Sequence, residues 1–209
     1  MAYGFLDIAA TASVKEAQRE NGSADYWAGF HGERSFDRFT ENEAAFIAAR
    51  DSFFMATVSE SGWPYVQHRG GPKGFLKVID DHTLAFADLR GNKQYISTGN
   101  LLTDNRVAII MVDYPRQARL KILGRVEILE GDAAKSWLDR VRVPGEKTVI
   151  ERVFVIHVEA YDWNCPQHIT PRYTAEEIRE GMQSIEKRVE ALEQENETLR
   201  KELAEFHTS

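Results

Sequence analysis

Five basic side chains gather between Tyr65 and Asn100, although the chain as a whole is acidic. They are Arg69, Lys73, Lys77, Arg90 and Lys93, accompanied by Gly62, Gly70, Gly71, Gly74, Gly91 and Gly99. The protein has 209 residues and a formal net charge of −7 at pH 7, so these cations do not belong to a generally basic surface. Basic side chains at strand ends, beside glycines that let backbone N–H groups approach closely, are suited to holding a phosphate dianion. The stretch therefore predicts a phosphate-bearing ligand.

The usual motifs for nucleotides, metals and serine nucleophiles are missing from the sequence. There is no G-x-G-x-x-G after a strand and no G-x-x-x-x-G-K-[ST], which argues against Rossmann and P-loop sites. There is no H-E-x-x-H and no cysteine pair, and the six histidines are scattered, so we expect no metal site. A G-x-S-x-G elbow is also missing. Strand ends and side-chain cations must then hold the phosphate.

Composition favours a folded protein of the cytoplasm. Hydrophobic residues make up 43% of the chain, which is enough for a core. The single cysteine, Cys165, rules out an internal disulfide and fits a reducing compartment. No apolar run has transmembrane length, and the N-terminal stretch lacks the basic region and apolar core of a signal peptide. We expect a cytoplasmic protein that binds neither membranes nor, given its negative charge, nucleic acid.

The elements that must position the basic residues are predicted from periodicity. Thr40-Glu41-Asn42-Glu43 is a capping box that starts a helix running to about Arg50. Further helices are expected at 92–102 and 132–140. Strands are predicted at 53–58, 64–69, 74–79, 83–87, 106–112, 119–129 and 149–161. This pattern indicates an α+β domain at residues 40–174 whose antiparallel strands close into a barrel, after an N-terminal extension at 1–39.

Residues 175–209 predict one long helix with a heptad repeat. The a and d positions hold Ile178, Met182, Ile185, Val189, Leu192, Asn196, Leu199, Leu203 and Phe206. Asn196 at an a position is typical of a parallel, in-register dimer, and the g-to-e′ pairs Arg188–Glu193 and Glu195–Arg200 would attract. We therefore predict a C-terminal coiled-coil helix. The alternative is an amphipathic helix packed on its own domain.

The run from Phe53 to Leu129 resembles the pyridoxamine 5′-phosphate oxidase superfamily of flavin-binding split β-barrels. The resemblance depends on the order and spacing of five segments: 75–77, 84–88, 90–94, 105–110 and 119–127. The chain is most similar to the predicted flavin-nucleotide-binding subgroup, which also has counterparts of 67–74 and 164–168. The resemblance implies an antiparallel split β-barrel with flanking helices, and a homodimer that holds FMN at the subunit interface.

The same resemblance implies which residues contact FMN. Arg69, Lys73 and Lys77 would hold the phosphate and ribityl chain, with Pro72 standing where the family has a basic residue. Lys93 would meet the phosphate at a helix N-terminus, with Asn92 replacing the family's arginine. Arg119 of the partner subunit would reach the flavin ring, and Gln167 would lie on the loop beside the substrate. The remaining predicted cofactor contacts are Ala87, Asp88, Arg90 and Gln94.

Other roles remain open for the basic residues. Arg69 and Lys77 would also serve as charges on an edge strand. Lys93 would also serve to solvate a helix, and Arg119 would also pair with Glu127 or another carboxylate on a strand.

The expected function is that of an FMN-dependent oxidoreductase that accepts hydride from a small organic molecule or a nicotinamide donor. The family's tyrosine-containing substrate cluster is replaced by Gly131–Arg140, which has no tyrosine. Efficient oxidation of pyridoxamine 5′-phosphate is therefore not expected. The alternative is a non-catalytic module that binds flavin or haem and assembles through its coiled coil.

Overall fold

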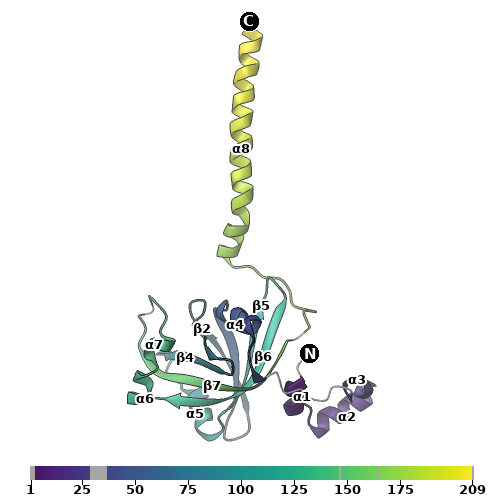
Figure 1. The fold of residues 1–209 in the computed structure, drawn as a ribbon, viewed down its shortest axis with the longest axis vertical. Coiled ribbons are helices and arrows are strands. Elements are labelled where there is room, and N and C mark those ends of the chain that lie inside the picture. The colour runs from purple at the N-terminus through teal and green to yellow at the C-terminus, as the bar shows by residue number, and fades with distance from the viewer. Residues whose placement is uncertain (1–2, 29–36, 146, 164, 209) are drawn as a thin grey trace. The chain divides into compact units, whose positions relative to one another are not determined.

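A seven-stranded antiparallel sheet forms the centre of the computed structural model, which describes residues 3–28, 37–145, 147–163 and 165–208 (Figure 1). Its strand order is β2-β1-β5-β6-β7-β4-β3. The bounds are β1 Ser52–Val58, β2 Pro64–Gly70, β3 Lys77–Asp80, β4 Thr83–Leu89, β5 Arg106–Asp113, β6 Ala118–Leu129 and β7 Ile150–Trp163. The predicted α+β class with an antiparallel split barrel is confirmed.

Eight helices occur among the described residues. They are α1 Tyr3–Ala9, α2 Ala12–Glu20, α3 Ala24–Ala28, α4 Glu41–Ala48, α5 Ile96–Thr103, α6 Gly131–Lys135, α7 Leu138–Val141 and α8 Ala175–Thr208. The chain divides into two compact units, one of residues 1–113 with 117–168 and the other of 114–116 with 169–209. The first unit holds the sheet, and the second holds α8.

The sheet curls back on itself. This is shown by a contact between β2, one edge strand, and β4, the second strand from the opposite edge. Arg69 Nη1 on β2 lies 2.6 Å from Asp88 Oδ1 on β4. Alternating residues point into the space that the sheet encloses, and Phe53, Phe86 and Phe154 are at most 2% exposed there. A smaller apolar cluster on the other side of β4 and β7 packs under α6 and α7. The basic stretch therefore folds along the seam where the sheet closes.

Helix α4 begins as predicted. The Thr40 N–H donates to Glu43 Oε2 at 2.9 Å and the Thr40 side chain accepts from the Glu43 backbone N–H, which forms the capping box; the Asn42 N–H also donates to the Thr40 hydroxyl at 3.2 Å. Ile47 on this helix is fully buried. Through Ile47 the helix packs on the core that the sheet encloses, beside β3.

Three predicted boundaries were wrong. Strand β3 begins at Lys77 rather than Gly74, because Phe75 N–H donates to the Pro72 carbonyl and makes a turn of residues 72–75. Helix α5 begins at Ile96 rather than Asn92, because Lys93 and Tyr95 adopt left-handed φ values of 62° and 52°. The helix predicted at 132–140 is divided into α6 and α7.

Candidate functional site

A cavity of about 200 Å³ lies where β2, β4, β7 and the start of α5 meet. Of the residues predicted to bind a cofactor, five line it: Arg69, Asp88, Asn92, Lys93 and Gln94. The cavity also includes Tyr65, Gln67, Tyr95, Ser97, Thr98 and Glu151, which were not among the predicted site residues. The contiguous basic stretch and the late strand β7 thus contribute to one site.

Asp88 is the shared carboxylate beneath this cavity. It is 5% exposed and accepts from Arg69 at 2.6 Å and from Arg152 Nη1 at 3.1 Å. Burial raises the pKa of Asp88, although the two guanidinium groups act in the opposite direction. Arg152 also donates to Thr98 at 3.0 Å and to Glu130 at 3.1 Å. Asp88 and Arg152 therefore fix Arg69 and the first turn of α5 relative to each other.

Arg69 combines rigidity with one unused donor. Its guanidinium lies over the rings of Phe86 and Phe154, with centroid distances of 5.8 and 5.5 Å. Its Nε is buried and has no hydrogen-bond partner among the described residues. A buried N–H without a partner costs free energy, so an acceptor at this position would stabilise the site. Arg69 is thus held in place beside the cavity with donor capacity to spare.

The loop before α5 presents a lysine to the same cavity. Its ends are fastened to β7: Arg90 Nε donates to Glu151 at 3.0 Å, and Tyr95 hydroxyl donates to Glu151 at 3.2 Å. The Gln94 N–H is held by the Asn92 side chain at 3.1 Å. Lys93 is exposed and forms no ion pair with the described residues. Its charge is therefore available to an anion.

A second cavity of about 340 Å³ adjoins the first, because Leu89 lines both. Its walls combine the apolar side chains of Phe75, Leu138 and Val141 with the glycine turn after β2 and with polar residues, including Arg142 and Lys147. A Cβ on Gly71 would lie 2.8 Å from Phe75 Cγ, so the turn needs glycine where the ring packs on it. Ala87, another predicted site residue, lies in this larger cavity.

A family model described as pyridoxamine 5′-phosphate oxidase matches residues 39–161, which include the whole sheet except the end of β7. The chain belongs to this family. Proteins of the family bind flavin and generally form dimers. No curated protein matches the sequence.

Several solved structures are similar to the chain at low identity. HupZ of Group A Streptococcus is 21% identical, with 65% of this chain and 100% of that chain covered and a TM-score of 0.46. A putative pyridoxamine 5′-phosphate oxidase of Lactobacillus delbrueckii is 22% identical, with 61% and 96% covered and a TM-score of 0.48. An FMN-binding protein of Syntrophomonas wolfei is 14% identical, with 73% and 95% covered and a TM-score of 0.44.

Five residues predicted from the family resemblance line neither cavity in the single chain. Lys73 is exposed on the turn after β2, and Lys77 lies opposite Ala85 on the sheet face that packs under α7. Arg90 pairs with Glu151, as described above. Arg119 donates to the Cys165 carbonyl at 3.2 Å, and its Nε is buried with no partner among the described residues. Gln167 is exposed, and the neighbouring Asn164 lies outside the described residues.

The sequence contained one signal for the missed residues. Glu151 and Arg152 are adjacent charges at the start of the otherwise apolar run Val153–Ile156. Charged residues at the beginning of a buried strand need partners, which here are Arg90, Asp88 and Glu130. No comparable signal marks Gln67 or Ser97, whose side chains hydrogen bond to each other at 2.9 Å.

Three neighbouring groups in the β3–β4 turn form the one potential metal-binding cluster among the described residues. Asp80, Asp81 and His82 are all exposed. His82 Nδ1 already lies 2.7 Å from Asp81 Oδ1, and Arg38 pairs with the same carboxylate at 2.9 Å. Within the described residues, no helix has the combination of length and apolar character that crossing a membrane would require.

Proposed function

We propose that the protein is an FMN-binding oxidoreductase of this family, with the FMN phosphate in the smaller cavity. The observation that carries the proposal is the pairing of two cations there: Arg69 with its unpartnered Nε and Lys93 with no ion pair among the described residues. A phosphate would give Lys93 an anionic partner and would give Arg69 Nε a hydrogen-bond acceptor. The residues present therefore fit this end of FMN.

The neighbouring side chains have complementary roles in the proposed site. Asp88 and Arg152 orient Arg69, while Glu151 fastens the loop that carries Lys93. Asn92 and Gln94 line the cavity beside the phosphate. Lys73, Lys77, Arg119 and Gln167 stay predicted contacts, Arg119 as a group from the partner subunit. An FMN bound there would supply hydride acceptance at its N5 atom, from a small organic molecule or a nicotinamide donor.

A second copy of the chain is the proposed partner, with FMN at the subunit interface. On the outer face of β2, β1 and β5 apolar residues adjoin one another, because Val66 pairs with Ala56, Ala56 with Ala108, and Phe54 with Ile110, while His68 lies opposite Phe54. Val66 is 60% exposed and Phe54 39% exposed in the single chain. Exposed apolar patches of this kind are typical of interfaces.

The remaining organisation is proposed from the sequence. We assign residues 1–39 to an N-terminal extension, 40–174 to the FMN-binding split-barrel domain and 175–209 to a coiled-coil helix. The proposed location is the cytoplasm. The substrate is proposed to differ from pyridoxamine 5′-phosphate, because Gly131–Arg140 lacks a tyrosine.

The direct test is the colour of the purified protein. We expect a yellow protein that releases FMN into the supernatant on heating, or a colourless one that turns yellow on titration with FMN. A protein that stays colourless and binds no added FMN would overturn the proposal. Riboflavin, which lacks the phosphate, should bind at least about tenfold more weakly, since a charge-assisted contact contributes about 1.5–3 kcal/mol.

A non-catalytic flavin carrier or sensor is the second candidate, and the long exposed α8 favours it because such a helix suits assembly. Anaerobic mixing with NADH or NADPH separates the two functions. Rapid bleaching of the flavin absorbance supports the oxidoreductase. Flavin that remains oxidised with both donors, but is reduced by dithionite, supports the carrier.

A further inference from the structure

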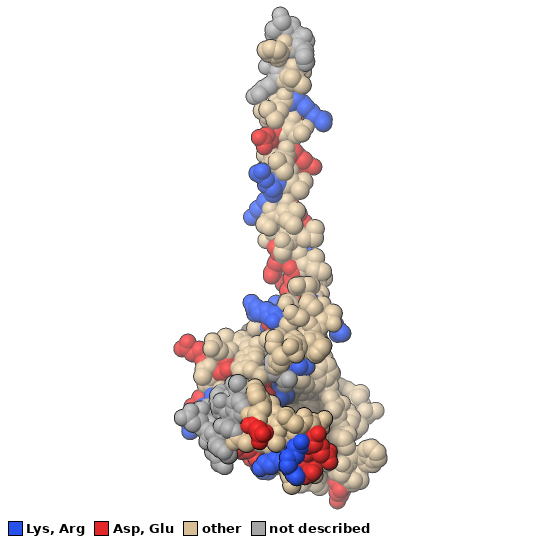
Figure 2. All heavy atoms as spheres, turned by 90° about the vertical axis from the view of Figure 1, so that its right-hand side faces the viewer, with Lys and Arg blue, Asp and Glu red and all other residues tan. Residues whose placement is uncertain are grey.

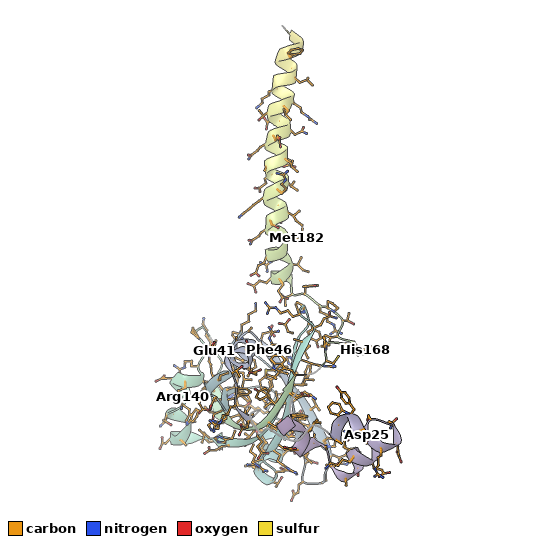
Figure 3. The ribbon with its side chains drawn as sticks, turned by 45° about the vertical axis from the view of Figure 1, so that its right-hand side comes forward. Asp25, Glu41, Phe46, Arg140, His168 and Met182 are labelled. Atoms are coloured by element: carbon orange, nitrogen blue, oxygen red, sulfur yellow. The ribbon has the colours of Figure 1, made fainter. Side chains whose placement is uncertain are left out.

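Helix α8 carries an exposed apolar stripe along its length. The seven apolar heptad residues from Ile178 to Leu203 are each between 45% and 59% exposed. Met182, near the start of the stripe, is labelled in Figure 3, and Figure 2 shows acidic and basic side chains along the same helix. The first turn is capped by Thr174 and Glu177, whose carboxylate accepts from the Thr174 N–H at 2.8 Å. The helix is thus well formed but exposes its apolar face.

The length of α8 limits what can cover this stripe. A helix of 34 residues is about 50 Å long, whereas a small domain is about 30 Å across. A partner that buries every apolar position must therefore be an elongated helix of similar length. A second α8 meets this requirement.

Charges beside the stripe specify a parallel pair. In a parallel dimer Arg188 faces Glu193 of the other helix, and Glu195 faces Arg200. None of these four side chains forms an ion pair with the described residues of its own chain. By contrast, Glu197 and Lys201 on the outer face pair within the helix at 2.8 Å. The charges that flank the stripe are therefore available to a partner helix.

Asn196 fixes the register. Only a parallel, in-register pair places Asn196 against its own copy, where the two amides can hydrogen bond, while keeping all nine heptad layers. In a fully overlapping antiparallel pair, Asn196 would lie at about the level of residue 187, beside apolar Ile185, where its amide would be buried without a partner.

We propose that α8 is an assembly surface whose partner is α8 of a second copy, in a parallel, in-register, two-stranded coiled coil. This inference does not depend on the flavin, because none of its residues lines the proposed FMN site.

Disulfide cross-linking of the full-length protein tests the orientation. In a Cys165→Ser background, Leu199→Cys would place two thiols opposite each other at a d layer. We expect oxidation to link the chains at least about tenfold faster than in the control Gln194→Cys, which lies on the outer face. Equal rates for the two variants would overturn the proposal. So would linkage that appears only when Ile185→Cys and Leu199→Cys are combined in one chain, since that result indicates an antiparallel pair.

Asn196→Leu tests the register independently. Removing the buried amide should raise the melting temperature of the helix and shift full-length chains toward trimers or higher oligomers in sedimentation equilibrium. An unchanged oligomer distribution would contradict the register. FMN content is measured on the Leu199→Cys protein as well. A protein that does not cross-link but binds FMN normally would refute the coiled coil alone. A protein that cross-links but binds no FMN would refute the proposed function alone.

Discussion

At the scale of single residues, the proposed site separates cations that hold the fold from cations that remain available. Arg152 and Arg90 are committed to carboxylates, and Arg69 is committed in part to Asp88. Lys93 forms no such pair with the described residues. Two of the five basic residues in the stretch, Arg69 and Arg90, are therefore paired with carboxylates, and of the three lysines only Lys93 lines the smaller cavity.

Lys93→Ala should weaken FMN binding by about tenfold or more, because it removes a charged contact to the phosphate. The measurement is a fluorescence titration of apoprotein with FMN. Lys187→Ala is the matched control, since Lys187 is an exposed lysine of α8 outside both cavities and is not a predicted FMN contact. Equal losses in the two variants would show that Lys93 acts only through overall charge.

Sequence reasoning found the half of the site that is local in the chain. Arg69, Asp88 and Lys93 lie within 25 positions, where glycines and basic residues mark them. Glu151 and Arg152 come from a strand more than 50 residues later, and only the sheet pairing of β4 with β7 brings them to Asp88. Their place in the site depends on the order of the strands in the sheet, which composition and short motifs do not predict.

At the scale of elements, strands were predicted well and irregular connections poorly. All seven predicted strands are present: β1 and β5 alternate between buried and more exposed residues, whereas β4 and the middle of β7 are apolar runs buried on both faces. The start of α5 was missed because Lys93 and Tyr95 take left-handed conformations that neither residue type favours. Contacts with Glu151 and Arg152, rather than local propensity, hold that loop.

The hydrogen-bonded pairing of β6 with β7 requires glycine at position 124. A Cβ there would lie 2.5 Å from the His157 carbonyl oxygen, at the bulge where the pairing register shifts. Gly124→Ala should therefore lower the free energy of unfolding by about 1–3 kcal/mol, measured by urea denaturation. Gly99→Ala in α5 meets no atom within 4 Å, and should be neutral or stabilising by up to about 1 kcal/mol. A Gly124→Ala protein as stable as the parent would contradict the close approach.

Helix α4 should make the fold sensitive to acid through Glu43. Burial opposes its charge, but hydrogen bonds from Thr40 and from Trp163 Nε1, at 2.6 Å, outweigh burial and lower the pKa below 4.5. A lowered folded-state pKa means that the stabilisation is complete above pH 4.5 and is lost as the pH falls through the folded value.

Glu43→Gln should lower the free energy of unfolding by about 1–2 kcal/mol at pH 7 and make it less dependent on pH below 4.5. Urea denaturation at a series of pH values measures both effects. Glu41→Gln is the control, because Glu41 is exposed in the first turn of the same helix. An unchanged acid slope in Glu43→Gln would show that other carboxylates dominate acid unfolding.

At the scale of the whole molecule, two surfaces expose apolar side chains in the single chain. They are the outer face of β2, β1 and β5, and the stripe of α8. Each is proposed to meet a second copy of the chain. Only the sheet face belongs to the unit that holds the proposed FMN site, so loss of that contact alone is expected to affect FMN binding.

Val66→Glu should disrupt the sheet-face dimer and reduce FMN affinity by about tenfold, because a charge would be buried at the interface. The Val66→Glu substitution is made together with Leu192→Lys. The second substitution is meant to prevent a coiled coil of α8 from holding two chains together. Light scattering after gel filtration gives the mass, and titration gives the affinity. Val14→Glu, an exposed apolar residue of α2, is the control. A dimer with full FMN affinity would place the subunit interface elsewhere.

The strand order also governs when the site comes into existence during synthesis. Strands β3 and β4 are made early, yet in the strand pairing of the described residues β7, the last strand to emerge, joins them to the rest of the sheet. The strands that carry Arg69 and Asp88 are therefore joined in one sheet only after residues 150–157 of β7 have been synthesised. Such distant pairings form slowly. In the proposed site, FMN would therefore be captured by a chain whose sheet is already complete and would not act as a template for the nascent barrel.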